Sequence, residues 1–486
     1  MNAKFLKKIK IDLSTRKARL ALRFFTYGVM TLATVVLTTL AVFYALGYRF
    51  DQAKGFEQGG LMQFRSAPDS AQVYVNGKKQ DFTTPGRANL PSGSYVVEMH
   101  KAGYQTWKKA VDLAPGQLLW LNYARLIPTD IKTRDVLALQ SVNGSMVSPD
   151  HKWILVSGKE NEIDLWLVDL DDPERPKADK IAVPDDLFTK RDNKFGQLEL
   201  VEWDSGSRYV LVKHSYGDET EFVRLDRSEP AKSVNLSRVF GLRVVDAHMA
   251  GGNADVVYAR TDDVLRKLDI PGNSASGALV SGVEKFDLYG NDSLVYVSKS
   301  ESQKAVGLYV QDKATVIRTY PADANLKIAY SEYDHHGYLA ISMNSETVLL
   351  RDPNADNKSS SQFATFDFGA QVNWVKFNNG GRLVAVNNGK DLGVYDIELA
   401  SFHKSLIGSG EEVASPPKWL DDYYLTTDAG GVLRIFEYDG INGGKITSVT
   451  PGQAVSLTQD GKWLFSFAKP EGAAGYILQA TKLTAE

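Results

Sequence analysis

Turn signals recur along residues 131–486 at intervals that average about 44 residues, and alternating apolar and polar residues flank them. The third alternating segment of a unit, such as DLWLVDL, GLYVQD or LGVYDI, mostly ends in an Asp that can start the next turn. An alternating strand cannot bury its apolar face alone, and this period is typical of the blades of a β-propeller. We therefore expect a β-propeller over residues 131–486. The turns are centred on Asp150, Ser205, Gly252, Asn291, His335, Asn379, Asp421 and Asp460.

The number of blades is open between seven and eight. Eight units can be counted along the chain, but an exchange of strands between the two chain ends would allow a ring of seven. In the first unit, Ser148-Pro149-Asp150 precedes Lys152-Trp153, and DLWLVD follows; the last unit has a similar pattern. These two units resemble the TolB-like and WD40-like repeats of bacterial envelope proteins, and the resemblance implies a propeller of that kind.

An uncharged segment of 23 residues runs from Phe24 to Leu46. As a helix it would be about 35 Å long, which is enough to cross a hydrocarbon core of about 30 Å. A cleaved signal peptide is the alternative, since Ala41 and Ala45 are small and basic residues precede the segment. The apolar part of a signal peptide is usually about 7–15 residues long, and this one is longer. We therefore expect an uncleaved, single-pass transmembrane helix, a signal anchor in contact with membrane lipid, over residues 24–46.

Basic residues are concentrated before the apolar segment. Residues 1–23 contain eight Lys and Arg residues and one acidic residue, Asp12, whereas the residues just after the segment have mixed charge. The positive-inside rule then predicts that residues 1–23 are cytoplasmic and that the C-terminal domains are extracytoplasmic. The remaining 48 basic and 58 acidic residues leave the body of the protein with a net charge of −10. Because phosphate binding needs an excess of positive charge, we expect no nucleic acid partner.

Residues 62–127 form a smaller module, and a linker of residues 47–61 is expected before it. Turn signals divide the module into five or six short strands, which predicts a small antiparallel β-sandwich. Its motifs, in chain order, are Pro68-Asp69-Ser70-Ala71, Val73-Tyr74-Val75-Asn76-Gly77, Thr84-Pro85, Leu90-Pro91-Ser92-Gly93 and Gly103-Tyr104 with Trp107. With these motifs the module resembles the PEGA domain of bacterial and archaeal surface proteins, although Asp-Ser replaces Glu-Gly in the first motif. The resemblance implies a spacer or a contact with wall carbohydrate or protein rather than an enzyme.

Four aromatic residues of this module are candidate ligand contacts. Exposed aromatic rings can stack on a sugar, whereas buried rings form a core. Both roles stay open at these positions, and the core is the commoner one. The four residues are Trp107, Trp120, Tyr104 and Tyr123.

No motif predicts a catalytic, cofactor or metal site. The chain has no cysteine, which excludes disulfides, thiolate metal sites and a cysteine nucleophile. It also lacks His-Glu-x-x-His, Gly-x-Ser-x-Gly and a phosphate-binding loop. Asp334-His335-His336 is the one local cluster that resembles a set of metal ligands, but it lies on a repeat turn, so a solvated turn is the preferred interpretation. The acidic run from Asp169 to Asp172 is better explained as a charged loop than as a calcium site.

Two functions are compatible with this sequence. In the first, the chain is a membrane-anchored binding or scaffold protein of the cell envelope. Its PEGA-like module is a spacer or wall contact, and its propeller binds an envelope protein, a peptide or a glycan. In the second, carboxylates from different blades form a glycosidase-like hydrolase site in the central funnel of the propeller. The absence of a catalytic motif favours the first function, without a cofactor.

Overall fold

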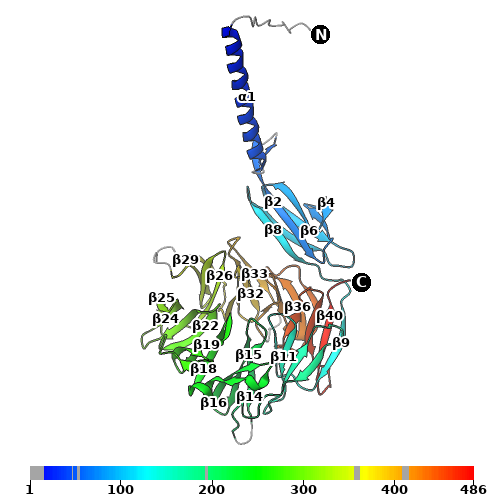
Figure 1. Cartoon of the computed structure of the whole chain (residues 1–486). Helices are drawn as coiled ribbons and strands as arrows, with labels where there is room; N and C mark the ends of the chain where they lie inside the picture. The colour runs from blue at the N-terminus through cyan, green and yellow to red at the C-terminus, as the bar shows by residue number, and fades with distance from the viewer. Residues whose placement is uncertain are drawn as a thin grey trace. The chain divides into compact units, whose positions relative to one another are not determined.

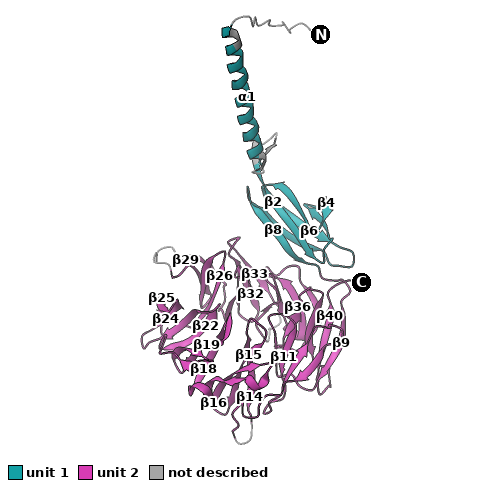
Figure 2. Ribbon diagram, viewed as in Figure 1, with its two compact units in different colours: residues 1–126 teal, residues 127–486 magenta. Residues whose placement is uncertain are grey.

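A computed structural model of the chain describes residues 16–45, 48–51, 55–191, 195–354, 362–407 and 415–485. Residues 1–15 of the predicted basic segment lie outside the described residues, as do Leu46 and Gly47. The chain divides into two compact units, Met1–Leu126 and Ile127–Glu486, which Figure 2 shows in separate colours.

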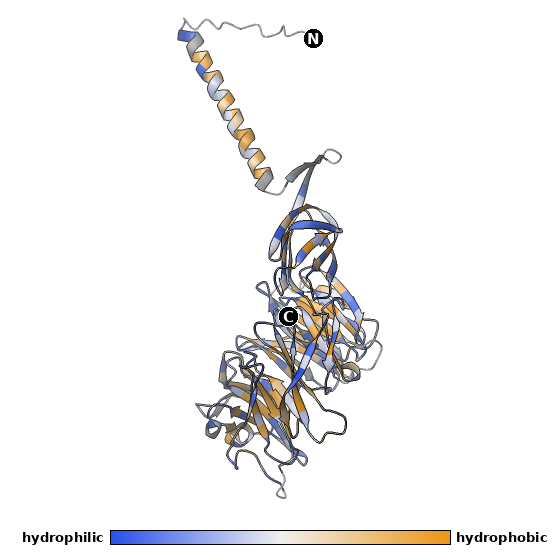
Figure 3. Cartoon of the chain, turned by 90° about the vertical axis from the view of Figure 1, so that its right-hand side faces the viewer, coloured by the Kyte–Doolittle hydropathy of each residue, from blue (hydrophilic) through white to orange (hydrophobic). Residues whose placement is uncertain are grey.

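Helix α1 (Arg16–Ala45) contains most of the uncharged segment. The hydroxyl groups of Thr26, Thr34 and Thr39 each donate to the carbonyl four residues earlier, at 2.8–2.9 Å, so the helix satisfies these polar groups internally. Large apolar side chains along the helix are exposed, and they form the orange stretches of the helix in Figure 3. In the described part of the chain, Leu20–Phe43 is the one helical stretch long and apolar enough to cross a membrane.

The rest of unit 1 is a sandwich of two sheets. In one sheet, β2 pairs with β1, with β5 and, in parallel, with β8; the other sheet has the order β4-β3-β6-β7. The stretch 47–61, for which the sequence predicts a linker, contains β1 and the start of β2. The strands are β1 (Tyr48–Asp51), β2 (Gly55–Ala67), β3 (Gln72–Val75), β4 (Lys78–Thr83), β5 (Gly86–Pro91), β6 (Gly93–His100), β7 (Trp107–Leu113) and β8 (Leu118–Arg125).

Two of the sequence motifs make turns in this sandwich. Asn76 and Gly77 have φ angles of 49° and 72°, as the hairpin turn between β3 and β4 requires. The Thr84 hydroxyl is buried, accepts a hydrogen bond from the Ala71 N–H at 2.9 Å and lies 2.6 Å from the Ser66 hydroxyl. Thr84 therefore joins the turn before β3 to the end of β2.

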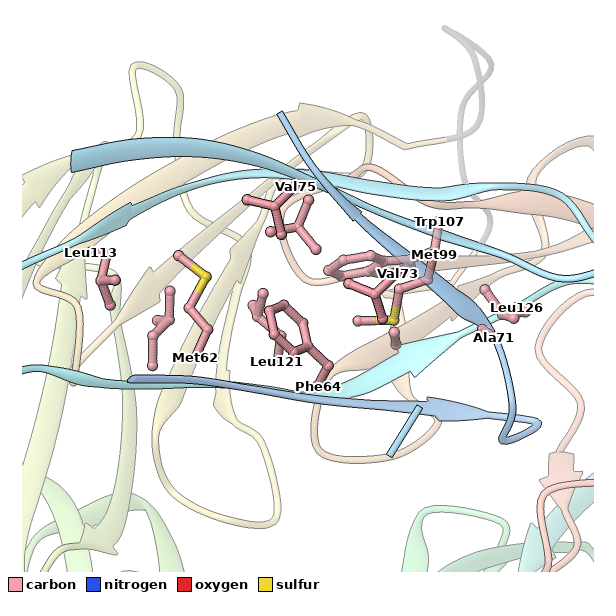
Figure 4. Packing of buried hydrophobic residues seen from close by; sticks show 13 residues of the cluster. Met62, Phe64, Ala71, Val73, Val75, Met99, Trp107, Leu113, Leu121 and Leu126 are labelled. Carbon is pink, nitrogen blue, oxygen red and sulfur yellow. The ribbon is translucent and has the colours of Figure 1, made fainter. Parts of the chain in front are cut away.

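Alternate residues of both sheets form the sandwich core, as Figure 4 shows. Met62 and Phe64 point inward from β2, and Val73, Met99 and Trp107 meet them from the opposite sheet. Each of these side chains is at most 2% exposed. Burial of a large apolar side chain contributes about 1.5–3 kcal/mol, so this core accounts for the stability of a module of modest size.

The described part of unit 2 contains eight four-stranded sheets, and Figure 1 shows them following one another around a ring. We call them blades one to eight. Blades one to four contain β10 (Gly144–Val147), β11 (Trp153–Ser157), β12 (Leu165–Asp169) and β13 (Lys177–Lys180); β14 (Gln197–Trp203), β15 (Tyr209–Tyr216), β16 (Glu219–Asp226) and β17 (Val234–Asn235); β18 (Val244–Ala250), β19 (Asn253–Thr261), β20 (Val264–Asp269) and β21 (Ser274–Ala275); and β22 (Val283–Tyr289), β23 (Ser293–Lys299), β24 (Gln303–Val310) and β25 (Lys313–Pro321).

The second half of the ring repeats this arrangement. Blades five to eight contain β26 (Leu326–Tyr333), β27 (His336–Met343), β28 (Glu346–Arg351) and β29 (Gln362–Asp367); β30 (Trp374–Phe377), β31 (Leu383–Asn387), β32 (Asp391–Asp396) and β33 (Ser401–Leu406); β34 (Lys418–Trp419), β35 (Tyr424–Thr427), β36 (Val432–Glu437) and β37 (Gly444–Ser448); and β38 (Val455–Leu457), β39 (Trp463–Ala468), β40 (Tyr476–Lys482) and β9 (Lys132–Leu139). Short helices η1 (Pro230–Lys232) and α2 (Leu236–Phe240) follow β16 and β17, and η3 (Ala429–Gly431) precedes β36.

Blade eight joins the two ends of unit 2. Its outermost strand is β9, which pairs with β40 from Tyr476 opposite Leu139 to Lys482 opposite Lys132. The hydroxyl groups of Thr133 and Thr481 lie 2.8 Å apart across this pair. The exchange of strands between chain ends therefore completes the eighth blade, and the ring of the described residues has eight blades rather than seven.

The Asp at the end of the third strand starts the next turn, as the repeat pattern predicts. Asp396 is fully buried and accepts hydrogen bonds from the backbone N–H groups of Glu398 and Leu399 at 3.0 and 3.1 Å. Arg382 makes two further bonds to its carboxylate at 2.7 and 2.9 Å. Asp226 and Arg208 repeat this arrangement in blade two. A buried, paired carboxylate at this position thus fixes the turn that leaves the third strand.

Candidate functional site

The first strand of each blade lies nearest the centre of the ring. These eight inner strands are β10, β14, β18, β22, β26, β30, β34 and β38. Inner strands of neighbouring blades contact one another, as β10 does β14 and as β26 does β30, which is expected where a ring is narrowest. Polar side chains on these strands are therefore brought together from sequence positions far apart, and a central channel is where propellers commonly bind ligands.

A cavity of about 300 Å³ opens between the inner strands of blades one and two. Its walls are mostly polar, with one carboxylate, Glu199. Glu199 is exposed, and its Oε2 lies 3.2 Å from the Nζ of Lys213. The cavity is lined by Asn143, Gly144, Ser145, Gln197, Leu198, Glu199, Leu200, Ser215 and Gly452.

The wall of the cavity near blade eight is held by side chains of neighbouring blades. The Ser145 hydroxyl donates to Gln453 Oε1 at 2.8 Å and accepts from the Ala454 N–H at 2.7 Å. Lys418 Nζ donates to the Gly452 carbonyl at 3.0 Å, and Asp428 accepts from the Gly452 N–H at 2.6 Å. Groups from blades one, seven and eight thus keep this wall in place.

His248 on β18 connects blades two and three. Its Nδ1 lies 2.8 Å from Glu202 Oε2 on β14, and the Met249 N–H donates to the other carboxylate oxygen. Burial lowers the pKa of His248, but the hydrogen bond and charge of Glu202, with the charges of Asp287 and Asp246, outweigh burial and raise the pKa to about 9. The imidazole is therefore protonated at neutral pH and forms an ion pair between the two blades.

This cluster does not favour a hydrolase. Glycoside hydrolysis generally uses two carboxyl groups, one as an acid and the other as a base or nucleophile. Burial raises the pKa of Asp246 despite the nearby charges of His248 and Arg260, which makes Asp246 the better candidate for the acid. Glu202, however, has both oxygens engaged by His248 and Met249. A structural link between blades is the better interpretation of these groups.

His214 and Glu221 form a second buried pair, inside blade two. His214 Nδ1 lies 2.9 Å from Glu221 Oε1, and Thr189 and Asn235 also donate to this carboxylate. Burial alone would raise the pKa of Glu221, but these hydrogen bonds outweigh burial and lower the pKa to about 2. Its partners lie in blade two and in the connection between blades one and two, so this pair has a structural role.

The Asp334-His335-His336 cluster forms the turn between β26 and β27. Asp334 and His335 have φ angles of 48° and 63°, in the left-handed region of a tight turn. His336 Nδ1 lies 2.6 Å from Asp352 Oδ2, and Arg351 contacts its other ring nitrogen. Among the described residues no group of three or more His, Asp or Glu side chains has the arrangement of a metal site.

The four aromatic residues of unit 1 have different surroundings. Trp107 is 1% exposed in the sandwich core, and Tyr123 meets it edge to face at 6.3 Å between ring centroids. Tyr104 and Tyr123 are half-buried against the same core. Trp120 is 40% exposed on β8, so it is the member of the set that a ligand can reach most readily.

Sequence patterns did not single out the charged residues of the inner strands. Four lysines lie on the inner strands of blades four to seven, and acidic residues lie on those of blades two to five. In the sequence each lysine looks like the polar member of an alternating strand. The signal that could have identified these lysines is their position in the repeat. A polar residue on the first strand of a blade lies near the centre of the ring rather than on its outer surface.

Residues 60–126 match the family model described as the PEGA domain, which confirms the resemblance seen in the sequence motifs. The match starts within β2 and ends at the last residue of unit 1. No curated protein matches the chain.

The chain is similar to solved propeller structures. The C-terminal WD40 domain of Sif2 is 10% identical, with 72% of this chain and 98% of that chain covered and a TM-score of 0.51. The Myceliophteria thermophila Cps50 (Swd1) β-propeller domain is 11% identical (72% and 99% covered, TM-score 0.41), and the Dos1 propeller is 10% identical (72% and 96% covered, TM-score 0.45). The likeness to the Sif2 domain confirms the predicted fold, an all-β chain whose larger part is a β-propeller.

Proposed function

We propose that this chain is a membrane-anchored, extracytoplasmic binding or scaffold protein of the cell envelope. The propeller fold is one that generally serves as a platform for protein interactions, and the observation that carries the proposal is the cavity between blades one and two. A cavity of about 300 Å³ is at the lower end of the range of small-molecule sites and accommodates one or two side chains of a bound protein or peptide. Its polar walls provide donors and acceptors without a catalytic pair.

The membrane anchor supports the location. An exposed apolar helix is unfavourable in water, and residues 24–46 supply the length that a bilayer needs. The eight basic residues of segment 1–23 favour a cytoplasmic N-terminus. In this proposal residues 62–127 and 131–486 form the extracytoplasmic domains.

The PEGA-like module is the spacer or wall contact in this arrangement. Trp120 offers an exposed indole ring on β8, and Tyr104 and Tyr123 lie half-buried nearby in the same module. Trp107 contributes through the core against which Tyr104 and Tyr123 pack. A glycan or protein contact made by this module would therefore depend on Trp120 more than on Trp107.

The experiment is a pull-down of the full-length, affinity-tagged chain from cross-linked envelopes. Gln197 is exposed at the cavity wall, so Gln197→Trp fills part of the cavity. Gln303→Trp on β24 is the matched control, since Gln303 is also exposed but lies on the third strand of its blade. We expect a specific partner that the wild type and Gln303→Trp retain and that Gln197→Trp loses. Equal retention by all three proteins would contradict a role of the cavity in binding.

A further inference from the structure

Lysine is confined to one arc of the inner strands. Lys285 on β22, Lys327 on β26, Lys376 on β30 and Lys418 on β34 belong to four consecutive blades, four to seven. In the described inner strands of the other four blades there is no Lys or Arg. We call these four residues the lysine arc. Lys376 and Lys418 are exposed, and Lys285 and Lys327 are half-buried, so solvent reaches all four side chains.

Carboxylates do not neutralise the lysine arc. Among the described residues, Lys327 and Lys376 have no carboxylate within ion-pair distance, and the same holds for Lys285 and Lys418. Lys285 Nζ donates to the Leu326 carbonyl, and Lys418 Nζ donates to the carbonyls of Gly452 and Gln453 at 3.0 and 3.3 Å. A carbonyl group orients an ammonium group but carries no net charge.

Four acidic residues lie near the arc along the fold, and two of them have other partners. Asp287 is two residues from Lys285 on β22, but no ion pair joins these two residues in the described part of the chain. Glu284 pairs with Lys304 at 2.9 Å, and Asp428 accepts hydrogen bonds from Ser415 and Gly452. Glu332 lies at the opposite end of β26 from Lys327. The positive charge of the arc is therefore in excess.

Like charges inside the blade and across its boundary add to the effect of burial on the arc. Burial, together with the charges of Lys327 and Lys304, lowers the pKa of Lys285 to about 8, against the opposing effect of Glu284. Although part of the Lys418 side chain is exposed, the protein around its ammonium group lowers its pKa by desolvation, and Lys376 adds to this shift while Asp428 opposes it. An anion in the arc would offset both the burial and the repulsion.

The rest of the protein restricts which anion can bind. The chain after residue 23 has a net charge of −10, so long polyanions are repelled by its outer surface. Acidic residues lie on the inner strands of blades two to five, namely Glu199, Glu202, Asp246, Glu284, Asp287 and Glu332. Apart from His248, blades two and three thus have only acidic charges on these strands, blades four and five have both signs, and blades six and seven have only lysine. A suitable ligand carries its negative groups on a thin, extended chain that reaches the inner strands.

We propose that the lysine arc binds an acidic peptide segment of a partner protein, with two or more Asp or Glu side chains on the lysines of neighbouring blades. This proposal rests on the binding function proposed above and specifies the chemistry of the partner. Because the arc spans four blades, it favours a segment that has several carboxylates at matching spacing over a segment with a single charge.

The test measures binding of a short, fluorescein-labelled Glu-rich peptide to the full-length chain in detergent micelles, by fluorescence anisotropy. A peptide with Gln in place of every Glu is the control ligand. Lys327→Gln/Lys376→Gln removes the two unpaired charges of the arc. Lys313→Gln/Lys445→Gln removes two exposed lysines from the outer strands β25 and β37 and is the matched control for net charge.

We expect binding of the Glu peptide and not of the Gln peptide. Lys327→Gln/Lys376→Gln should weaken the affinity about tenfold, since it removes two charge pairs with the peptide, and the control variant should change the affinity less than about twofold. Higher salt should weaken wild-type binding.

Three results would overturn the proposal: equal affinity for both peptides, equal loss in both variants, or displacement of the peptide by inorganic polyphosphate at an equal concentration of charge. The last result would assign the arc to phosphate anions. Retention of the envelope partner by Lys327→Gln/Lys376→Gln would also reject the arc, yet it would leave the proposed binding function standing.

Discussion

Trp107 and Trp120 show how burial separates two residues of one type. Trp107 is 1% exposed, whereas Trp120 is 40% exposed. We expect Trp107→Ala to destabilise unit 1 by about 3–5 kcal/mol, because it leaves a cavity in the core, and Trp120→Ala by about 1 kcal/mol or less. Hydrogen exchange of the β6 and β7 amides in the full-length chain measures this difference. Similar losses of protection in both variants would contradict the assignment of Trp107 to the core.

The ion pair of His248 and Glu202 predicts a dependence of stability on pH. The pKa of His248 is raised to about 9 from an ordinary value near 6.5. A raised histidine pKa contributes stability that is fully present below about 6.5 and is lost as the pH rises through about 9. We expect the Tm of the propeller to fall between pH 7 and 10, and Glu202→Gln to flatten this decrease. An identical slope in both proteins would exclude the pair as its source.

At the scale of strands, the pairing of β9 with β40 closes the ring. Asp135 and Gln479 are opposite each other in this pair, and Gln479 Nε2 donates to Asp135 Oδ1 at 3.2 Å. Because the chain has no cysteine, Asp135→Cys/Gln479→Cys introduces one defined disulfide. We expect it to stabilise unit 2 by up to about 5 kcal/mol, since it closes a very long loop in the unfolded chain.

Urea unfolding with and without a reductant measures the effect of this disulfide, and each single cysteine variant is a control. A double variant that forms the disulfide but unfolds at the same urea concentration in both conditions would show that opening of the β9–β40 pair does not limit stability.

The elements that the sequence predicts well depend on local pattern. The repeat of turns indicated the propeller, and the Asp at the end of the third strand, as at Asp396, indicated the turn that follows it. Closure by β9 depends on pairing between residues about 340 positions apart, so local alternation gave a count of eight units but left a ring of seven blades open. The lysine arc was missed for the same reason: Lys285 and Lys327 become neighbours only when their blades pack.

At the scale of the whole molecule, the proposed topology places the two ends of α1 on opposite sides of a membrane. The absence of cysteine allows single reporters at Lys4→Cys and Lys78→Cys. In intact cells we expect a membrane-impermeant maleimide to label Lys78→Cys and not Lys4→Cys, because the basic N-terminus stays in the cytoplasm. Labelling of both after permeabilisation is the control. The reverse pattern in intact cells would invert the topology.

The position of β9 also determines when the ring can close during synthesis. β9 is made at the start of unit 2, but its partner β40 follows about 340 residues later. At roughly 5–20 residues per second, the ribosome needs about 20–70 s to make that interval. Throughout this time β9 has no ladder partner, and blade eight has only the strands made so far. A premature stop codon anywhere before β40 therefore yields an open arc of blades with an orphaned first strand, not a smaller closed propeller.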